Sequence, residues 1–594
     1  MASFKIGINM AGAISAGAYT AGVLDFLTEA LDEWYKAKAR GEAVPMHDVS
    51  IEVFSGASAG GMCAAISAVM LHEDFEHIHD TSKHGTTNRF YESWVNKIDI
   101  RDLLKSDDLK DARTVVSLLD SSVLSQIATY ALTPSNPMSS PRRYVSPNLT
   151  LFLSLTNLRG EPYSLNGAAP GSIEETTFFY GDRIRFETLP SHRTSPQSPS
   201  AYTIDLTQPG AVGGWDVLQT AAMATGAFPL FLAPRILQRK VGDYTPPMWE
   251  SVASAVTGTP PPIAPNFPPN LPQTFATLNI DGGITNNDPF NYAHDYLVSL
   301  DPPSPQGQSF LGSREADRAV IGIAPFPTTD KFDVTFDPAE QSDIFFVLPR
   351  LFGALISQSR FFGESLSQIM TGTTFSRFII APSDDELVSK YQTESGTCPK
   401  AQPPALQCCA TLGAFGGFFE RGFRAHDYAL GRRNCQKFLR DYFVLPADNV
   451  IMKPALEALD PTTRASVIAS FKHPAPATYI ESAQPLDPKD LTTHEIEGQP
   501  KNVWLPIIPL CTECVSRPIA SIPRSQISEA DLKLIVKLVL KRFRVVVSVL
   551  LLQVSSWPLR IFLRIGQPII AWLARRPLRE KLIKQLGDSY RPNP

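Results

Sequence analysis

A glycine-flanked serine at the junction of a strand and a helix is the feature that most constrains this chain. Residues 56–60 read Gly-Ala-Ser-Ala-Gly and directly follow the apolar run Ile51–Ser55. Small and apolar residues come next, and they favour a helix. Gly56 and Gly60 tolerate the strained backbone of a sharp turn, which exposes the hydroxyl of Ser58 at the helix start. The pattern predicts a strand, a tight turn and a helix, with Ser58 as a nucleophile for acyl transfer.

A second segment, at the N-terminal end, suits the binding of negative charge. A short apolar strand at Lys5–Ile8 runs into a loop of small residues that includes Gly12, Ala13 and Ile14. A helix is expected to follow, from about residue 17 to residue 38. Backbone N–H groups of such a loop, with a helix dipole behind them, can hold the negative oxygen of a tetrahedral intermediate.

The third segment ends in an acidic residue. Residues 277–283 read Thr-Leu-Asn-Ile-Asp-Gly-Gly, so Asp281 closes an apolar run and Gly282 and Gly283 follow it. The carboxyl end of a strand is where open α/β sheets place their chemistry. An ordinary turn is the alternative interpretation, because Asp-Gly is a common turn pair.

In their order and context these three segments resemble the patatin-like phospholipase family, over roughly residues 4–325. Residues 17–24 are similar to the helix after the family's glycine loop, and residues 224–229, with Pro234 after them, to a small-residue helix end between serine and aspartate. The resemblance implies a serine acyl hydrolase acting on membrane lipid esters, with Ser58 as nucleophile, Asp281 as base and no obligatory histidine. It implies no cofactor.

A carboxylate is a weak base toward a hydroxyl, because the ordinary pKa of aspartate is near 4. Burial beside an apolar acyl pocket is expected to raise the pKa of Asp281 and help it accept the proton. Backbone amides of Gly12, Ala13 and Ile14 are expected to form the oxyanion hole, which carries much of the reduction in the barrier.

The sequence departs from the family pattern in the first loop. Family members carry three or four consecutive glycines and then a basic residue, whereas here only Gly12 and Gly17 remain and Ala16 occupies the basic position. The backbone N–H groups of this loop can still donate to the oxyanion if φ is negative at Ile14. They cannot do so if the loop needs φ above zero there. Large bacterial patatin-related proteins resemble this variant. A membrane-associated patatin-fold scaffold with weak or no catalysis is therefore one alternative function.

A Ser-His-Asp esterase is the other alternative, with the chain order Ser, Asp and His. Candidate histidines after Asp281 are His294, His426, His473 and His494. We expect His294 to be partly exposed on a helix over residues 288–300, and His426 to be structural.

The distribution of apolar runs predicts an α/β fold with a largely parallel central sheet flanked by helices on both faces, helical insertions and a helical C-terminal extension. We divide the 594 residues into a catalytic domain (1–385), a helical or irregular extension (386–527) and a basic amphipathic helical tail (528–594). The strand-like runs are 5–8, 51–55, 149–156, 275–280, 319–324 and 375–381.

The tail concentrates positive charge. Residues 528–594 hold 13 basic and four acidic residues, a net charge of +9, although the whole chain carries −5. Its longest uncharged stretch, Val545–Leu559, has 15 residues and is too short to span a bilayer. The sequence favours an interfacial helix pair bound to anionic lipid, with a hairpin packed on the protein as the alternative. The flanking cations are Lys537, Lys541, Arg542, Arg544, Arg575, Arg576 and Arg579.

The remaining features argue for a cytoplasmic protein, peripheral on the inner face of the membrane. Removal of the apolar N-terminal run as a secretory signal would delete the oxyanion loop. The seven cysteines include one CxxC, at Cys511 and Cys514, without a second ligand pair, so no metal site is expected. Nucleic-acid modules and phosphate-binding GxxxxGK loops are absent from the sequence.

Overall fold

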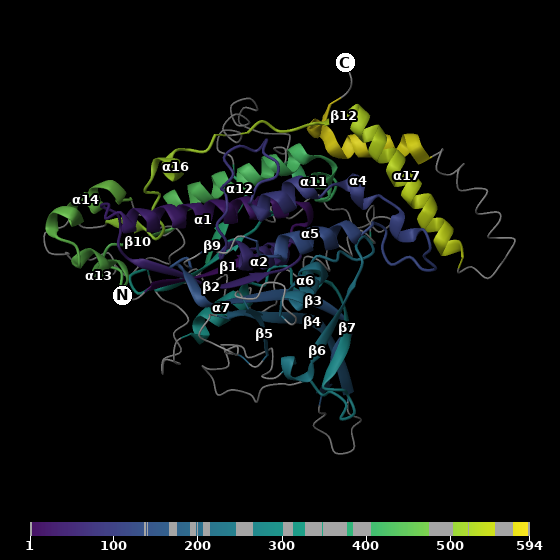
Figure 1. Cartoon of the computed structure of the whole chain (residues 1–594), viewed down its shortest axis with the longest axis horizontal. Helices are drawn as coiled ribbons and strands as arrows, with labels where there is room; N and C mark the ends of the chain where they lie inside the picture. Colours follow the sequence, from purple (N-terminus) through teal and green to yellow (C-terminus); the bar gives the residue numbers. More distant parts are fainter. Residues whose placement is uncertain are drawn as a thin grey trace.

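A central sheet with helices on both faces organises the protein (Figure 1). The computed structural model describes residues 3–135, 138, 141–165, 175–189, 198, 200–205, 214–244, 265–300, 313–326, 347, 377–383, 406–473, 503–520, 522–552 and 574–591.

The described strands of the sheet follow the order β5-β4-β3-β2-β1-β8-β9. Neighbours from β3 to β9 in this order pair in parallel, and β4 runs antiparallel to β3. The sequence prediction of a largely parallel sheet in an α/β fold is confirmed. Strand bounds are β1 (Ser3–Met10), β2 (Asp48–Gly56), β3 (Val145–Leu165), β4 (Glu175–Leu189), β5 (Ala201–Asp205), β8 (Arg318–Ile323) and β9 (Arg377–Ile380).

Alternation along β2 divides the core between the two faces of the sheet. Val53 and Phe54 are both buried, and successive strand side chains point to opposite faces. Val53 packs in a cluster with α7 (Phe290–Ser299), whereas Phe54 belongs to the large cluster that includes α1 (Gly17–Ala39) and α2 (Ala59–Met70). The second half of the strand, from Val53 onward, is therefore buried from both sides.

An arm extends from the body of the protein, formed by β3 and β4 together with β6 (Arg235–Lys240) and β7 (Thr274–Asp281) (Figure 1). β3 has 21 residues, far longer than the five or six that are typical of a strand. β7 pairs antiparallel with β3 and with β6. The run predicted at 275–280 is thus a strand, but it is antiparallel to its neighbours.

Helices and short strands complete the described fold. The larger helices are α5 (Ser122–Leu132), α6 (Gly214–Thr225), α12 (Arg421–Asp441), α14 (Pro461–Phe471) and α17 (Glu529–Leu551). The short elements are η1 (Ile14–Ala16), α3 (Arg89–Tyr91), the π-helical η2 (Glu92–Lys97), α4 (Ile100–Leu103), η3 (Asp107–Leu109), η4 (Val241–Tyr244), η6 (Gly282–Ile284), η7 (Cys408–Ala410), α11 (Gly416–Phe419), β10 (Val444–Pro446), α13 (Met452–Glu457), β11 (Trp504–Pro506), α16 (Glu513–Ser516), β12 (Ile527–Ser528), η8 (Gly587–Ser589) and β13 (Tyr590–Arg591).

Two glycines allow α12 to pack tightly against α1. A Cβ at Gly22 would lie 2.0 Å from the carbonyl oxygen of Tyr428, and one at Gly431 would lie 2.2 Å from that of Tyr19. Arg432 of α12 is buried and pairs with carboxylates of α1. Residues beyond 400 therefore share a core with the N-terminal helix. The three-part division of the chain stays a prediction.

Helix α17 packs one face on the protein. Val546 and Val549 contact Leu109, while Arg542 is 2% exposed and pairs with Asp108. This corrects the expectation for Arg542, because its guanidinium is held inside the protein and cannot reach a lipid headgroup. Residues 553–573 of the predicted tail, which include the end of the uncharged stretch Val545–Leu559, lie outside the described residues. Among the described helices, none combines the length and the apolar content that crossing a bilayer requires.

Candidate active site

The serine predicted as a nucleophile occupies a strained turn between β2 and α2. Ser58 has φ 52° and ψ −127°, which lies outside the regions favoured by residues with side chains. Its backbone N–H donates to Thr225 Oγ1 at 2.9 Å. A Cβ at Gly56 would lie 2.6 Å from the backbone of Gly60, and a Cβ at Gly60 would lie 2.2 Å from the carbonyl oxygen of Met10. Neither position has room for a side chain, so both require glycine.

Sheet topology brings the aspartate to the same edge. β2 lies between β1 and β3, and Asp281 at the end of β7 is paired with Leu155 of β3, two residues beyond the partner of Gly56. The Oγ of Ser58 donates to Asp281 Oδ2 at 2.7 Å, although the two residues are 223 positions apart. The N–H of Gly283 donates to the other carboxylate oxygen at 2.8 Å. The Asp-Gly-Gly segment therefore orients its own carboxylate.

Burial changes the acidity of this carboxyl group. Asp281 is 3% exposed, and burial raises its pKa from 3.8 to about 7, against the opposing hydrogen bonds from Ser58 and Gly283. A group with this pKa exchanges a proton readily near neutral pH. The direction of the shift agrees with the sequence expectation.

The N-terminal loop lies against the serine. A Cβ at Gly12 would be 3.0 Å from the Cβ of Ser58 and 2.2 Å from Asn287 Oδ1, so this position requires glycine. The N–H of Gly12 donates to the carbonyl oxygen of Asn287 at 3.0 Å. This corrects the expectation for Gly12, because its amide already has an acceptor. Within the described residues, the N–H groups of Ala13 and Ile14 donate to no protein acceptor.

Ile14 has φ 46°, in the left-handed region. This conformation is rare for a β-branched residue, whose side chain crowds the backbone there. The sequence argument expected donation by the loop amides to fail if φ at Ile14 were positive, and the structure has the positive value. That criterion is corrected here, because Ile14 adopts the left-handed conformation and, among the described residues, no acceptor takes up its N–H or that of Ala13. Their role as oxyanion donors stays a prediction.

Sequence reasoning missed two residues that shape the site. Thr225 holds the backbone of Ser58, and its position at the end of α6, within a run of small residues, was the available signal. The carbonyl oxygen of Asn287 accepts the N–H of Gly12. Its side chain lies close to Gly283, where an added Cβ would be 2.5 Å from Asn287 Oδ1. The neighbouring residues in the sequence are also polar, so Asn287 could not be distinguished from an ordinary loop residue.

The candidate histidines His294 and His426 have acidic partners other than Asp281. His294 is buried on α7, not partly exposed as expected, and its Nδ1 lies 3.1 Å from Asp295. His426 is also buried, with its Nδ1 2.9 Å from Asp427. The carboxylate oxygens of Asp281 accept from a serine and a backbone amide instead. His494 lies outside the described residues.

A separate polar cluster joins η7 to α12. Ligand-type atoms of Cys408, His426 and Asp427 lie within 4.8 Å of one another. Both carboxylate oxygens of Asp427 accept backbone N–H groups, from Cys408 at 2.8 Å and from Cys409 at 2.9 Å. These bonds fit a structural role, in which Asp427 fixes η7 on α12.

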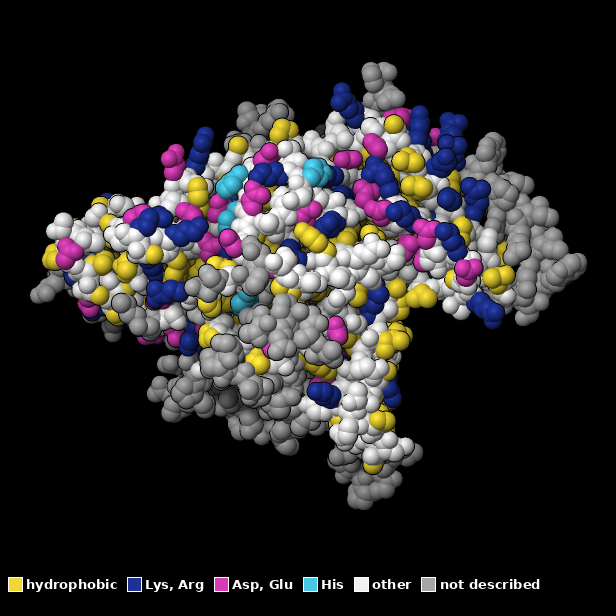
Figure 2. All heavy atoms as spheres, in the orientation of Figure 1, with side chains coloured by type: hydrophobic (Ala, Val, Ile, Leu, Met, Phe, Trp, Pro, Cys, Tyr) yellow, Lys and Arg dark blue, Asp and Glu magenta, His cyan; other side chains and the backbone are white. Residues whose placement is uncertain are grey.

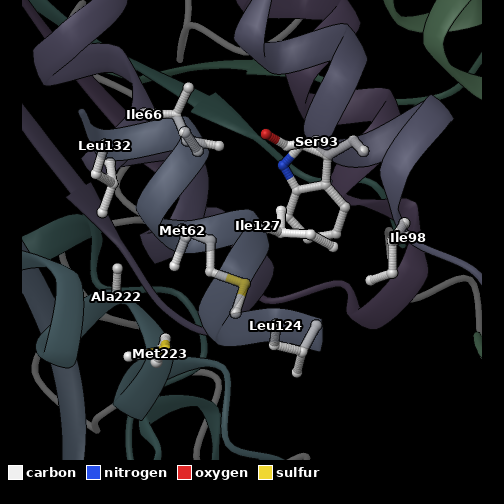
Figure 3. Close-up of a pocket in the computed structure, with 12 residues that line it drawn as sticks. Met62, Ile66, Ser93, Ile98, Leu124, Ile127, Leu132, Ala222 and Met223 are labelled. Atoms are coloured by element: carbon white, nitrogen blue, oxygen red, sulfur yellow. The ribbon is translucent and has the colours of Figure 1, made fainter. Parts of the chain in front are cut away.

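A small apolar pocket opens beside α2, one helical turn from Ser58 (Figure 3). Met62 of α2, Ile127 of α5 and Met223 of α6 surround the same space in Figure 3. A Cβ at Gly226 would lie 2.5 Å from Met62 Cε, so Met62 also contacts the turn that follows Thr225. The other lining residues are Ile66, Ser93, Trp94, Ile98, Leu124, Ala128, Ala131, Leu132 and Ala222.

Comparisons with known proteins found similar chains in Sinorhizobium fredii and Legionella pneumophila. An uncharacterized protein, y4iI, of Sinorhizobium fredii (strain NBRC 101917 / NGR234) is 35% identical over 484 residues, which is 75% of this chain. The match spans 65% of that relative, slightly less than two thirds of its length. The crystal structure of VipD from Legionella pneumophila aligns with 100% of this chain and 89% of its own, at 12% identity and a TM-score of 0.18, which is too low to carry an argument.

The sequence profile of the family described as patatin-like phospholipase matches residues 9–294. That range includes the N-terminal loop, the strained serine turn and the Asp-Gly-Gly segment, in the order found in the sequence. Residues 9–294, which hold Ser58 and Asp281, are therefore similar to the patatin-like phospholipase family.

Proposed function

We propose that this protein is a lipid acyl hydrolase that cleaves carboxylic esters through a dyad of Ser58 and Asp281. The observation that carries the proposal is the 2.7 Å hydrogen bond from Ser58 Oγ to a buried carboxylate whose pKa is about 7. The match of residues 9–294 to the patatin-like phospholipase family supports lipid esters as the substrate class.

In the first half of the reaction, Ser58 Oγ attacks the ester carbonyl carbon while its proton passes to Asp281 Oδ2. The carbonyl oxygen becomes negative, and the N–H groups of Ala13 and Ile14 stabilise it. Collapse of the tetrahedral intermediate breaks the bond to the alcohol oxygen, which receives the proton from Asp281. An acyl group remains on Ser58.

In the second half, Asp281 takes a proton from water, and the resulting hydroxide attacks the acyl carbon. Collapse releases the fatty acid and returns the proton to Ser58. Burial of Asp281 suits this double role, because a carboxyl with a pKa of about 7 accepts and donates protons at comparable cost near neutral pH.

The apolar pocket beside α2 is the proposed site for the acyl chain. It begins one helical turn from Ser58, at Met62, and apolar side chains line most of it. Replacing Ala131 by Phe would fill the pocket from α5. We expect this variant to lose activity on long acyl chains while retaining it on acetyl esters.

Hydrolysis of a panel of phospholipids and neutral glycerolipids tests the proposed reaction. Ser58→Ala and Asp281→Asn should each lower turnover at least 100-fold with folding retained. Ser67→Ala is the matched control, because Ser67 is a buried serine of α2, the helix that follows Ser58, and it donates to the carbonyl oxygen of Cys63. Full activity of the Ser58 variant would refute the dyad. Loss of activity in a His426→Ala variant with unchanged folding would favour a Ser-His-Asp esterase instead.

We also propose that the outer face of α17 binds a membrane surface rich in anionic lipid. Lys537, Lys541 and Arg544 are exposed on this helix, together with the apolar side chains of Phe543 and Leu550. Figure 2 shows Lys and Arg side chains gathered at the α17 end of the molecule, interspersed with acidic ones. This arrangement supports peripheral binding, in which cations attract headgroups and apolar groups enter the interface.

Vesicle co-sedimentation tests the membrane surface. Exchanging both Lys541 and Arg544 for Gln should weaken binding to anionic vesicles by about 30-fold, because each cation contributes about 1 kcal/mol. Lys453→Gln, on α13, is the control, and soluble-ester turnover should not change. The assignment would be overturned if the double variant bound anionic vesicles as strongly as the wild-type protein does and bound neutral vesicles equally well.

A further inference from the structure

We propose that residues 411–417, which we call the clasp, position the oxyanion loop at residues 12–15 for catalysis. This inference rests on the proposed function of Ser58, and the clasp lies beyond the family match at residues 9–294. The loop contains Ile14, whose positive φ is unfavourable for its residue type. Such a conformation persists only where surrounding contacts determine it.

Hydrogen bonds join the clasp to the residue that directly follows Ile14. The Oγ of Ser15 donates to the carbonyl oxygen of Ala414, and the N–H of Ser15 donates to the same oxygen at 3.2 Å. In return, the N–H of Gly417 donates to Ser15 Oγ at 3.1 Å. Ser15 is fully buried, so water does not compete for these bonds.

The clasp has an unusual backbone of its own. Leu412, Gly413 and Ala414 have φ values of 56°, 62° and 72°, a run of three residues in the left-handed region. A Cβ at Gly417 would lie 2.4 Å from the sulfur of Cys409 and 2.6 Å from the Oγ of Ser15, so only glycine fits there. This close approach gives the clasp its contact with Ser15.

Helix α12 anchors the clasp at both ends. The N–H groups of Cys408 and Cys409 donate to Asp427, which fixes the segment that precedes the clasp. At the other end, Arg424 Nη1 donates to the carbonyl oxygen of Gly417 at 2.6 Å. Because α12 also packs tightly on α1, the clasp is fixed relative to the helix that follows the oxyanion loop.

The clasp also contacts the turn beside the aspartate. The ring of Phe415 packs against Phe228 and Phe231, with centroids 5.7 and 5.2 Å apart. These rings follow Ala227, whose carbonyl oxygen accepts the N–H of Asp281 at 3.0 Å. The clasp therefore touches the oxyanion side and the carboxylate side of the site at once.

Loss of the Ser15 bonds would let Ile14 relax toward negative φ and redirect the neighbouring amides. Ser15→Ala removes the hydroxyl without adding bulk, and Gly417→Ala pushes the clasp away from Ser15. Ser67→Ala is the control for loss of a buried serine hydroxyl that bonds a backbone carbonyl. We would measure kcat and KM on a soluble nitrophenyl ester, with active sites counted by a fluorophosphonate, and hydrogen exchange of the peptide covering residues 9–19.

We expect Ser15→Ala to lower kcat per active site by about 10- to 100-fold with KM within about twofold, as for a misplaced oxyanion donor. Exchange of the amides at residues 15 and 16, which donate to the carbonyl oxygens of Ala414 and Ala13, should become faster in this variant and stay unchanged in Ser67→Ala. Wild-type exchange in Ser15→Ala, or faster exchange with wild-type kcat, would overturn the positioning role. Absence of Ser58-dependent turnover in the wild-type protein would instead refute the proposed function, and exchange would still decide whether the clasp holds the loop.

Discussion

The buried carboxyl of Asp281 should make the protein less stable as the pH rises, and Asp281→Asn should remove this dependence. Burial raises the pKa of Asp281 from 3.8 to about 7, so the folded protein binds this proton more tightly than the unfolded chain does. The stabilising effect of the bound proton is complete below about pH 4. It is lost progressively as the pH rises to about 7.

The size of the effect follows from the two pKa values. They differ by about three, and each pKa unit corresponds to about 1.4 kcal/mol, so ionisation of Asp281 costs the folded state about 4 kcal/mol at pH 8. Asparagine does not ionise. The difference in unfolding free energy between Asp281→Asn and wild type should therefore grow by about 4 kcal/mol from pH 4 to pH 8, in favour of the variant.

Thermal unfolding of both proteins across this pH range measures the difference. About 4 kcal/mol corresponds to an increase on the order of 5 °C in the gap between the two midpoints, for a cooperative unit of a few hundred residues. Subtraction cancels the titration of all other groups. Asp460→Asn is the control, because Asp460 is exposed and hydrogen bonds lower its pKa. The difference between the unfolding midpoints of this variant and wild type should therefore stay constant above pH 5. A constant gap for Asp281→Asn would refute the reasoning about burial.

Three further substitutions probe the elements that support the site. Thr225→Val leaves the buried N–H of Ser58 without its acceptor, which should lower kcat and reduce stability by about 1–3 kcal/mol, measured by ester kinetics and chemical denaturation. Gly22→Ala places a methyl group 2.0 Å from a carbonyl oxygen of α12 and should lower stability by about 3 kcal/mol, whereas Gly242→Ala, which meets no neighbour within 4 Å, should be neutral by the same measurement. Arg432→Ala leaves two carboxylates of α1 without their buried partner, so we expect a loss of about 3–5 kcal/mol in a denaturant titration, and a loss below 1 kcal/mol would contradict the ion-pair account.

Local sequence patterns were sufficient to single out Ser58 and Asp281, because each comes at the end of an apolar strand. The way they meet was not predictable from these patterns. Strand β3 pairs in parallel with β2 and antiparallel with β7, which places Asp281 two residues beyond the partner of Gly56. The catalytic roles themselves stay predictions.

Other features depend on contacts between distant residues, which local patterns do not encode. Ser15 and Ala414 are 399 positions apart, so the glycine-rich run after Leu412 gave no indication of its partner. In the sequence Arg542 looked like its exposed basic neighbours and was predicted to face lipid, yet it is buried and pairs with Asp108. The reversed direction of β7 was hidden because an apolar strand has the same composition in either orientation.

The most direct test of the account is to locate the residue that becomes acylated. Wild-type protein would be mixed with a slowly turned-over ester, quenched in acid, digested and analysed by mass spectrometry. The account predicts an acyl adduct on the peptide that contains Ser58, and little adduct in Asp281→Asn. An adduct on a different residue, or an equal amount of adduct on Ser58 without the carboxylate of Asp281, would contradict the proposed dyad.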